Sequence, residues 1–231
     1  MKRFFYQGEP MKKVLLATAA AAAFGTAASA DILEYADIYP LSTTNWDGTI
    51  SIAQFDSSLG TLNSVYLELR GYVEGSSRVE SLDAAPSTIT AELSAELSMS
   101  TAALSDILVT LPVVSEMFDA EAFDGTIDFA GGSGTEWLDQ MADDMDDATL
   151  TGSDMDEFIG MGSIDLILEA IGMSTASGAG NIITQFATSA GADIYVRYDY
   201  TPNAPAVPLP AGLPLLLAGL GAFGVVRARK G

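Results

Sequence analysis

The side chains that could do chemistry in this chain of 231 residues are mainly carboxylates and hydroxyls, with a few arginines. The sequence contains no His and no Cys. Without them the chain lacks the usual general base, the thiol nucleophile, disulfides and the commonest ligands of transition metals. Residues 31–206 also lack Lys, which excludes Ser–Lys and Schiff-base catalysis there. Among the common hydrolytic schemes, only a carboxylate pair of the glycosidase type remains.

The densest group of carboxylates lies between residues 139 and 157. Its members are Asp139, Asp143, Asp144, Asp146, Asp147, Asp154, Asp156 and Glu157. Ca²⁺ prefers such oxygen ligands, and a bound cation would relieve repulsion among carboxylates at the C-terminal end of a helix. The spacing does not match an EF-hand loop, because the required Gly and Glu positions are not filled. We expect a solvated acidic surface, with Ca²⁺ binding as the alternative, and assign no catalytic, cofactor or metal residue.

The charge of the chain is unevenly distributed. Seven of the ten basic residues lie before residue 31 or after residue 206. Residues 31–206 keep only Arg70, Arg78 and Arg197 against 30 acidic residues, which gives this segment a formal charge of −27. So negative a field disfavours nucleic acids and anionic lipid surfaces as partners. We therefore predict that the protein does not bind nucleic acid.

Three aromatic residues are candidates for contact with sugars. Tyr66 and Tyr195 occupy outward positions of predicted strands, and Trp46 lies in a predicted polar loop. Exposed aromatic rings could stack on sugar rings of an exopolysaccharide. The alternative is that these residues form cross-strand surface pairs, which stabilise a sheet.

Alternation of apolar and polar residues dominates residues 31–206 and predicts strands. In the clearest run, apolar side chains occupy every second position: Ile89, Ala91, Leu93, Ala95, Leu97 and Met99. Further strands are predicted at residues 65–73, 164–169, 194–199, 49–55, 106–114 and 126–130. Many strands separated by polar turns favour an antiparallel β-sandwich.

One segment favours a helix instead. Trp137, Met141 and Met145 recur at every fourth position, and Ser133 stands three residues before Glu136, as in a capping box. These features predict a helix over residues 135–148, packed on the sheet. The predicted fold is therefore mainly β, a jelly-roll-like antiparallel β-sandwich with one short packed helix. An N-terminal signal peptide and a C-terminal transmembrane helix are expected in addition.

The N-terminal segment has the pattern of a secretory signal peptide. Met11-Lys12-Lys13 precedes an apolar run at residues 14–24, and Ala28-Ser29-Ala30 supplies the small-x-small cleavage pattern. We predict that residues 1–30 are removed by signal peptidase, with cleavage after Ala30. The residues before Met11 do not suit a signal peptide, so Met11 is the expected start. A long n-region that still functions is the alternative.

The C-terminal segment has three parts in a fixed order. After a linker at residues 203–206 come Val207-Pro208-Leu209-Pro210-Ala211, an uncharged apolar stretch at about 212–226, and the basic residues Arg227, Arg229 and Lys230. The stretch suits a membrane-spanning helix, and the basic residues favour a cytoplasmic location for its end. The arrangement resembles the VPLPA variant of the PEP-CTERM sorting signal. That resemblance implies processing by an exosortase and delivery to the cell surface or extracellular matrix of a Gram-negative bacterium. An ordinary membrane anchor is the alternative.

The segment at residues 54–65, Gln-Phe-Asp-Ser-Ser-Leu-Gly-Thr-Leu-Asn-Ser-Val, resembles the signature of choice-of-anchor E domains. A late aromatic strand at residues 195–200 extends the resemblance, which would cover residues 36–202. We interpret the block as a strand end, a glycine turn and the next strand, with Phe55 and Leu59 capping the core. The family has no known activity, so the resemblance assigns no catalytic residue.

These observations predict an exported, exosortase-sorted surface or matrix protein without catalytic activity. Its β-sandwich would span residues 31–202, held at the cytoplasmic membrane until the tail is processed. The predicted partners are signal peptidase, an exosortase-like enzyme and, through the C-terminal helix, the membrane. The alternative function is a carbohydrate-binding module associated with exopolysaccharide, with Ca²⁺ as a structural ligand.

Overall fold

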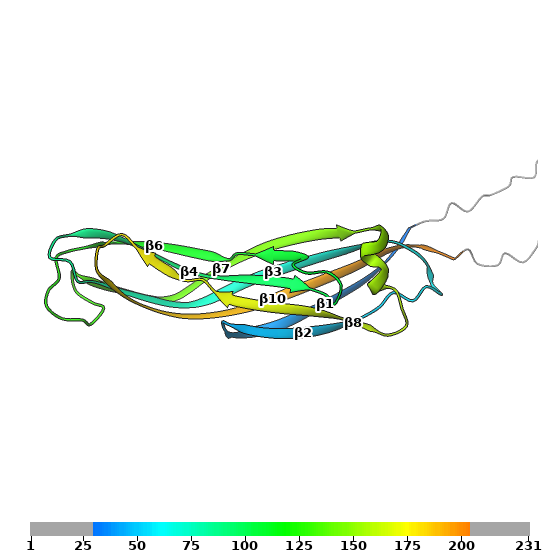
Figure 1. Cartoon of the computed structure of the whole chain (residues 1–231), viewed down its shortest axis with the longest axis horizontal. Coiled ribbons are helices and arrows are strands. Elements are labelled where there is room, and N and C mark those ends of the chain that lie inside the picture. The colour runs from blue at the N-terminus through cyan, green and yellow to red at the C-terminus, as the bar shows by residue number, and fades with distance from the viewer. Residues whose placement is uncertain (1–29, 204–231) are drawn as a thin grey trace, which may run out of the picture.

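The computed structural model describes residues 30–203, which form two antiparallel sheets packed face to face (Figure 1). The predicted β-sandwich is thereby confirmed. Among these residues, no helix is long and apolar enough to cross a membrane. The elements are β1 (Asp31–Thr43), β2 (Trp46–Ala53), β3 (Gly60–Ser81), β4 (Ser87–Ser100), β5 (Leu108–Thr110), β6 (Val113–Ala120), β7 (Gly134–Leu150), the 3₁₀ helix η1 (Gly152–Phe158), β8 (Ser163–Gly172), β9 (Thr175–Ser177) and β10 (Ile182–Pro202).

The four-stranded sheet has the order β1-β10-β3-β7, and the six-stranded sheet has the order β2-β8-β4-β5. Strands β6 and β9 also pair with β4, along its N-terminal half. Strands β3 and β10 are 22 and 21 residues long and pair along almost their whole length. At ~3.3 Å per residue they set the long axis of the molecule, roughly 70 Å.

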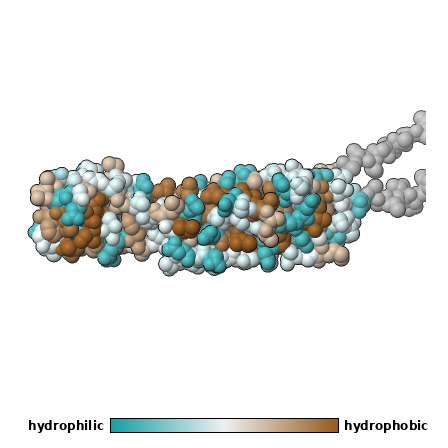
Figure 2. Space-filling model, in the orientation of Figure 1, coloured by the Kyte–Doolittle hydropathy of each residue, from teal (hydrophilic) through white to brown (hydrophobic). Residues whose placement is uncertain are grey.

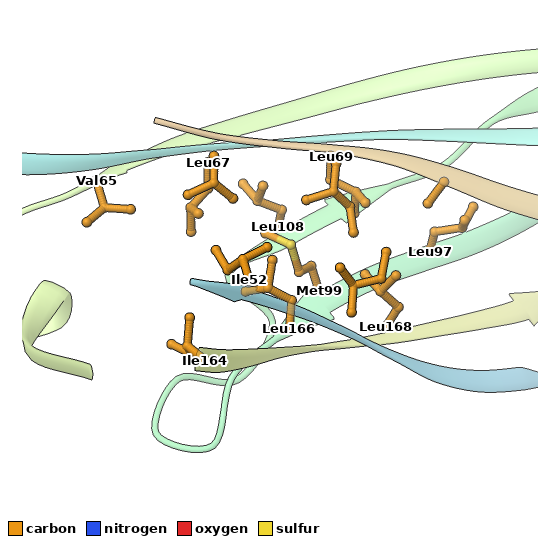
Figure 3. Close-up of a cluster of buried hydrophobic side chains, with 14 of the residues drawn as sticks. Ile52, Val65, Leu67, Leu69, Leu97, Met99, Leu108, Ile164, Leu166 and Leu168 are labelled. Atoms are coloured by element: carbon orange, nitrogen blue, oxygen red, sulfur yellow. The ribbon is translucent and has the colours of Figure 1, made fainter. Parts of the chain in front are cut away.

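The core lies between the two sheets and follows the predicted alternation. Side chains of β3 such as Leu67 and Leu69 face Leu166 and Leu168 of β8 across the sandwich (Figure 3). All four are at most 1 % exposed. A second, smaller cluster is formed by Val79, Ile89, Ala91 and Ala120. The core is thus built from residues whose position in the sequence pattern placed them on the inward faces.

The predicted helix at residues 135–148 is wrong, because this segment is most of β7. It pairs with β3 over the register Val65–Leu150 to Glu80–Gly134. Met141 and Met145, four residues apart, share a face in a strand as they would in a helix, so their spacing did not distinguish the two. Met141 and Met145 are 65 % and 54 % exposed, on the outer face of the four-stranded sheet. The short helix of the described residues is η1.

Other boundaries also differ from the predictions. Residues 126–130, predicted as a strand, lie in the loop between β6 and β7. The strand predicted at 106–114 is divided between β5 and β6, and the whole of β1 was not foreseen. Of the two residues expected to cap the core, Phe55 is fully buried but Leu59 is 45 % exposed.

Both ends of the described chain lie at the same end of the molecule (Figure 1). The reason is the pairing of β1 with β10, in which Asp31 stands opposite Tyr200. Residues 28 and 29 of the predicted cleavage site, and the whole predicted tail from Val207 to Lys230, lie outside the described residues. The loops that follow β3, β6 and β9 lie at the opposite end, which we call the distal end.

Candidate functional site

A groove crosses the outer face of the four-stranded sheet near its middle. Its floor is formed by small residues of the two central strands, Gly75 and Ser76 of β3 and Ala187 and Ser189 of β10. Its volume is about 460 Å³. A floor of small side chains leaves the backbone of the sheet accessible from outside.

The walls of the groove come from irregularities in the two edge strands. In β1 the register with β10 shifts between Tyr39 and Ser42, and Leu41 in this bulge is 40 % exposed. In β7 an extra residue opposite Ser76 makes a second bulge, where Asp139 has φ of 52°. Such bulges re-aim side chains. The groove therefore lies between two edge strands that are both irregular at the same level.

Exposed apolar side chains line these walls. Leu138 and Met141 of β7 are 61 % and 65 % exposed. Glu74 and Asp139 add carboxylates, while hydroxyls come from the floor. The groove can therefore hold a ligand that combines an apolar face with hydroxyl or amino groups, since carboxylates accept hydrogen bonds from both.

A second hollow of about 270 Å³ adjoins the groove and shares Glu74 and Met141 with it. Arg70 lines it and is held by an ion pair, with 3.0 Å between its Nη2 and Oδ2 of Asp143. Tyr72 also lines this hollow. The pKa of its phenol is raised, mainly by burial and to a smaller extent by the nearby carboxylates of Asp193 and Glu74. Arg78 and Arg197, the other arginines of the described chain, are also ion-paired. No arginine between residues 30 and 203 is left unpaired to attract an anionic ligand.

The acidic residues between 139 and 157 do not form one cluster in the structure, and several of them have separate partners. Asp143 pairs with Arg70, whereas Asp144 and Asp146 point to β5 and accept hydrogen bonds from the backbone N–H groups of Leu111 (2.9 Å) and Val109 (3.1 Å). These two carboxylates close the free edge of β5. The helix end that motivated a Ca²⁺ ligand is not formed. Within residues 30–203 no three His, Cys, Asp or Glu side chains converge to hold a metal ion.

One buried carboxylate has a structural contact at the distal end. Glu80 of β3 is fully buried beneath the loop between β6 and β7. Its Oε2 accepts a hydrogen bond from the N–H group of Phe129 at 2.7 Å. Phe129 has φ of 56°, so this bond helps to hold the loop in an unfavourable backbone conformation.

The aromatic residues considered for sugar stacking are engaged with the protein. The Tyr66 and Tyr195 rings form an edge-to-face pair with centroids 6.1 Å apart. The Tyr195 hydroxyl donates to Oε1 of Glu34 at 2.6 Å, and this bond, with burial, raises its pKa. The Trp46 ring stacks on the Tyr39 ring with centroids 4.2 Å apart, and its Nε1–H donates a hydrogen bond to the Ala190 carbonyl. The prediction of a polar loop at Trp46 is wrong, and the alternative of a cross-strand pair is confirmed for the two tyrosines.

Sequence reasoning did not find the groove residues. Leu41, Leu138 and Met141 are apolar residues at outward positions, which is the one signal that the sequence carries. Nothing local shows that β1 and β7 flank the same two strands, because their pairing partners are more than 50 residues away in the sequence. The grouping became visible only in the folded sheet.

The chain matches no known family model and no curated protein sequence. Distant similarities to solved structures exist. One is to Desmodium yellow mottle tymovirus, with 10 % identity, 89 % of this chain and 98 % of that chain covered, and a TM-score of 0.22. Another is to infectious bursal disease virus, Gx strain, with 14 % identity, 85 % of this chain and 47 % of that chain covered, and a TM-score of 0.18. A third is to the tailspike protein of Acinetobacter baumannii phage AM24, with 14 % identity, 77 % of this chain and 27 % of that chain covered, and a TM-score of 0.17. Similarity this low supports no argument about function.

Proposed function

We propose that the protein is an exported surface or matrix protein without catalytic activity, sorted by an exosortase-like enzyme that acts on its tail. The observation that carries this proposal is the order of parts in the tail, with the pentapeptide Val207–Ala211, the apolar stretch and the basic residues in sequence. If the resemblance to choice-of-anchor E domains holds, the β-sandwich is the part of the protein that is exported.

The place where the described chain ends supports the proposal. β10 ends at Pro202, five residues before Val207, at the end of the molecule where β1 also begins. The buried core residues all lie between Ile50 and Tyr198. Cleavage near the pentapeptide would therefore leave the core intact and release a sandwich whose distal end points away from the site of attachment.

The test is the mass and location of the mature protein. Intact-mass analysis after cell fractionation should find a C-terminus near Val207–Ala211 in the extracellular fraction, and an N-terminus at Asp31. Replacing both Pro208 and Pro210 by Ala should leave the tail uncut and the protein in the membrane. Pro205→Ala, just outside the motif, is the matched control. A wild-type protein that still ends at Gly231 in the membrane would overturn the proposal.

A second candidate function, carbohydrate binding, rests on the groove rather than on the aromatic residues. Its apolar walls suit the C–H face of a sugar, and Glu74 with the hydroxyls of Ser76 and Ser189 suits sugar hydroxyl groups. Because the sandwich is strongly acidic and its arginines are paired, a neutral or amino sugar fits better than an acidic polysaccharide.

Binding of chitosan and alginate oligosaccharides to the wild type and to two methionine variants would test this second function. Chitosan oligosaccharides should bind and alginate oligosaccharides should not. Met141→Ala removes part of one wall and should raise the dissociation constant about fivefold, whereas Met145→Ala, on the same face but outside the groove, should change it less than about twofold. Equal effects of the two substitutions, or no binding of chitosan at millimolar concentration, would exclude the groove as the site.

A further inference from the structure

The four-stranded sheet has an open edge in its distal half. β1 ends at Thr43, which stands opposite Ser189 of β10. Beyond that point β10 continues to Ile182, paired with β3 on one side only. On its other side no strand of the described chain pairs with residues 182–188. Figure 1 shows β1 and β2 confined to the half of the molecule that holds the two ends of the described chain.

The backbone groups of this edge have defined directions. The carbonyl of Thr188 points to the open side, because it accepts a hydrogen bond from the N–H group of Thr44 at 3.1 Å. The pairing of β10 with β3 is regular from Ile182 to Asp199, so these directions alternate along the strand. The N–H and C=O groups of Ile182, Thr184 and Phe186 therefore point away from β3, where another strand could bind them.

This edge is also uncharged, which is unusual in so acidic a protein. No charged residue occurs from Ala170 to Ala192, although the described chain has 30 carboxylates. A hollow of about 360 Å³ beside the edge is likewise lined by uncharged residues, among them Asn45, Ser174, Phe186 and Thr188. Charged side chains and prolines usually protect open edges from pairing, and residues 182–188 contain neither. Hydrophobic residues also reach the surface at the distal end (Figure 2).

We propose that this open edge is a homotypic interface, at which residues 182–188 of two copies of the chain pair as antiparallel strands. In one register, the backbone groups that point away from β3 in the two copies face each other. This register places Thr184 opposite Thr184 and Ile182 opposite Phe186. It allows about six backbone hydrogen bonds. The pairing is isologous, so it closes as a dimer. It joins the distal halves of two four-stranded sheets into one continuous sheet.

The choice of a second copy as the occupant follows from the charges. Two sandwiches that each carry a formal charge of −27 repel each other at most approaches. Over the uncharged edge no like charges are brought into direct contact, and antiparallel pairing makes the edge its own complement. Ile182 and Phe186 are half-buried against the second core cluster, and pairing would cover their exposed flank.

The interface is small compared with the roughly 1,200–2,000 Å² buried by stable complexes. We therefore expect a reversible dimer whose affinity depends on salt. Raising the ionic strength from about 20 mM to about 300 mM shortens the Debye length and screens the repulsion between the two acidic bodies, so dimerisation should strengthen at least tenfold. A salt bridge interface would weaken under the same change.

A proline at Thr184 separates edge pairing from folding. The N–H group of Thr184 makes no bond within the sheet, so Thr184→Pro should leave the far-ultraviolet circular dichroism unchanged. In sedimentation equilibrium of the full chain in detergent, it should raise the dimer dissociation constant at least tenfold. Thr184→Ala keeps the N–H group and should change that constant less than about twofold. A wild type that stays monomeric at 300 mM salt, or equal behaviour of the two variants, would refute the interface.

Cysteine cross-linking tests the register on cells and does not depend on the proline variant. The chain has no Cys, so Thr184→Cys introduces a single thiol. In the proposed register the two thiols face each other at a Cα separation of about 5.5 Å, within the range of a disulfide. We expect a covalent dimer after mild oxidation, and none for Ser115→Cys on the exposed face of β6. Equal yields of covalent dimer at the two positions would count against the proposed register.

Discussion

Replacing Phe55 by Ala should lower the free energy of unfolding by about 3–5 kcal/mol, as expected for a fully buried aromatic residue. Phe55 is 0 % exposed, and its ring centroid lies 5.1 Å from that of Tyr200 and 6.0 Å from that of Tyr198. Its N–H group donates to the carbonyl of Phe158 at 2.8 Å. The substitution would leave a cavity where η1, β10 and the turn before β3 meet, and these elements could close it only by moving together.

Leu59→Ala is the matched control, because Leu59 belongs to the same sequence block but is 45 % exposed. It should cost less than about 1 kcal/mol. Urea denaturation of the two variants beside the wild type, followed by tryptophan fluorescence, measures both differences. Similar losses for Phe55→Ala and Leu59→Ala would mean that the block does not cap the core through Phe55.

Replacing Gly75 by Ala should destabilise the protein by about 3 kcal/mol, although it adds a single methyl group. A Cβ atom at Gly75 would lie 2.0 Å from the backbone carbonyl oxygen of Ala187 and 3.2 Å from Cδ2 of Leu93. The first of these atoms belongs to the central pair of strands and cannot rotate away. β3 and β10 would have to separate at the floor of the groove, which weakens their neighbouring hydrogen bonds.

Ser76→Ala is the control for this prediction, since Ser76 is the next residue of β3 and its side chain points outward into the groove. It should change the free energy of unfolding by less than about 0.5 kcal/mol. Thermal unfolding monitored by circular dichroism would show the difference. If Gly75→Ala melted within two degrees of the wild type, the close approach of β3 and β10 at this point would be disproved.

The strand faces could be predicted from the sequence because side chains alternate between the two faces of a strand. In β4 the apolar residues from Ile89 to Met99 are all buried, as the alternation indicated. The same reasoning correctly placed Leu67 in β3, Leu166 in β8 and Val196 in β10. These assignments need no knowledge of a partner strand, since one buried face and one solvated face are enough to fix them.

The segment at residues 135–148 was different because its local pattern was compatible with both a helix and a strand. A strand at this position is stabilised by backbone hydrogen bonds to β3, whose residues lie some 70 positions earlier in the chain. No local spacing records those bonds. The bulge at Asp139 adds a residue, so the alternation of inward and outward side chains reverses between Trp137 and Met141. The pattern of a regular strand is therefore interrupted in the sequence.

The sequence by itself determined the acidic character of residues 31–206, the absence of His and Cys, and the inward faces of the long strands. It also predicts the signals at the two ends. Only the tertiary structure decided which carboxylates close the edge of β5, where the groove crosses the sheet, and that β10 has an open edge beyond Thr188. These features depend on where one strand ends relative to its neighbour. Strand registry is set by hydrogen bonds and packing between residues far apart in the chain, so a local pattern cannot contain it.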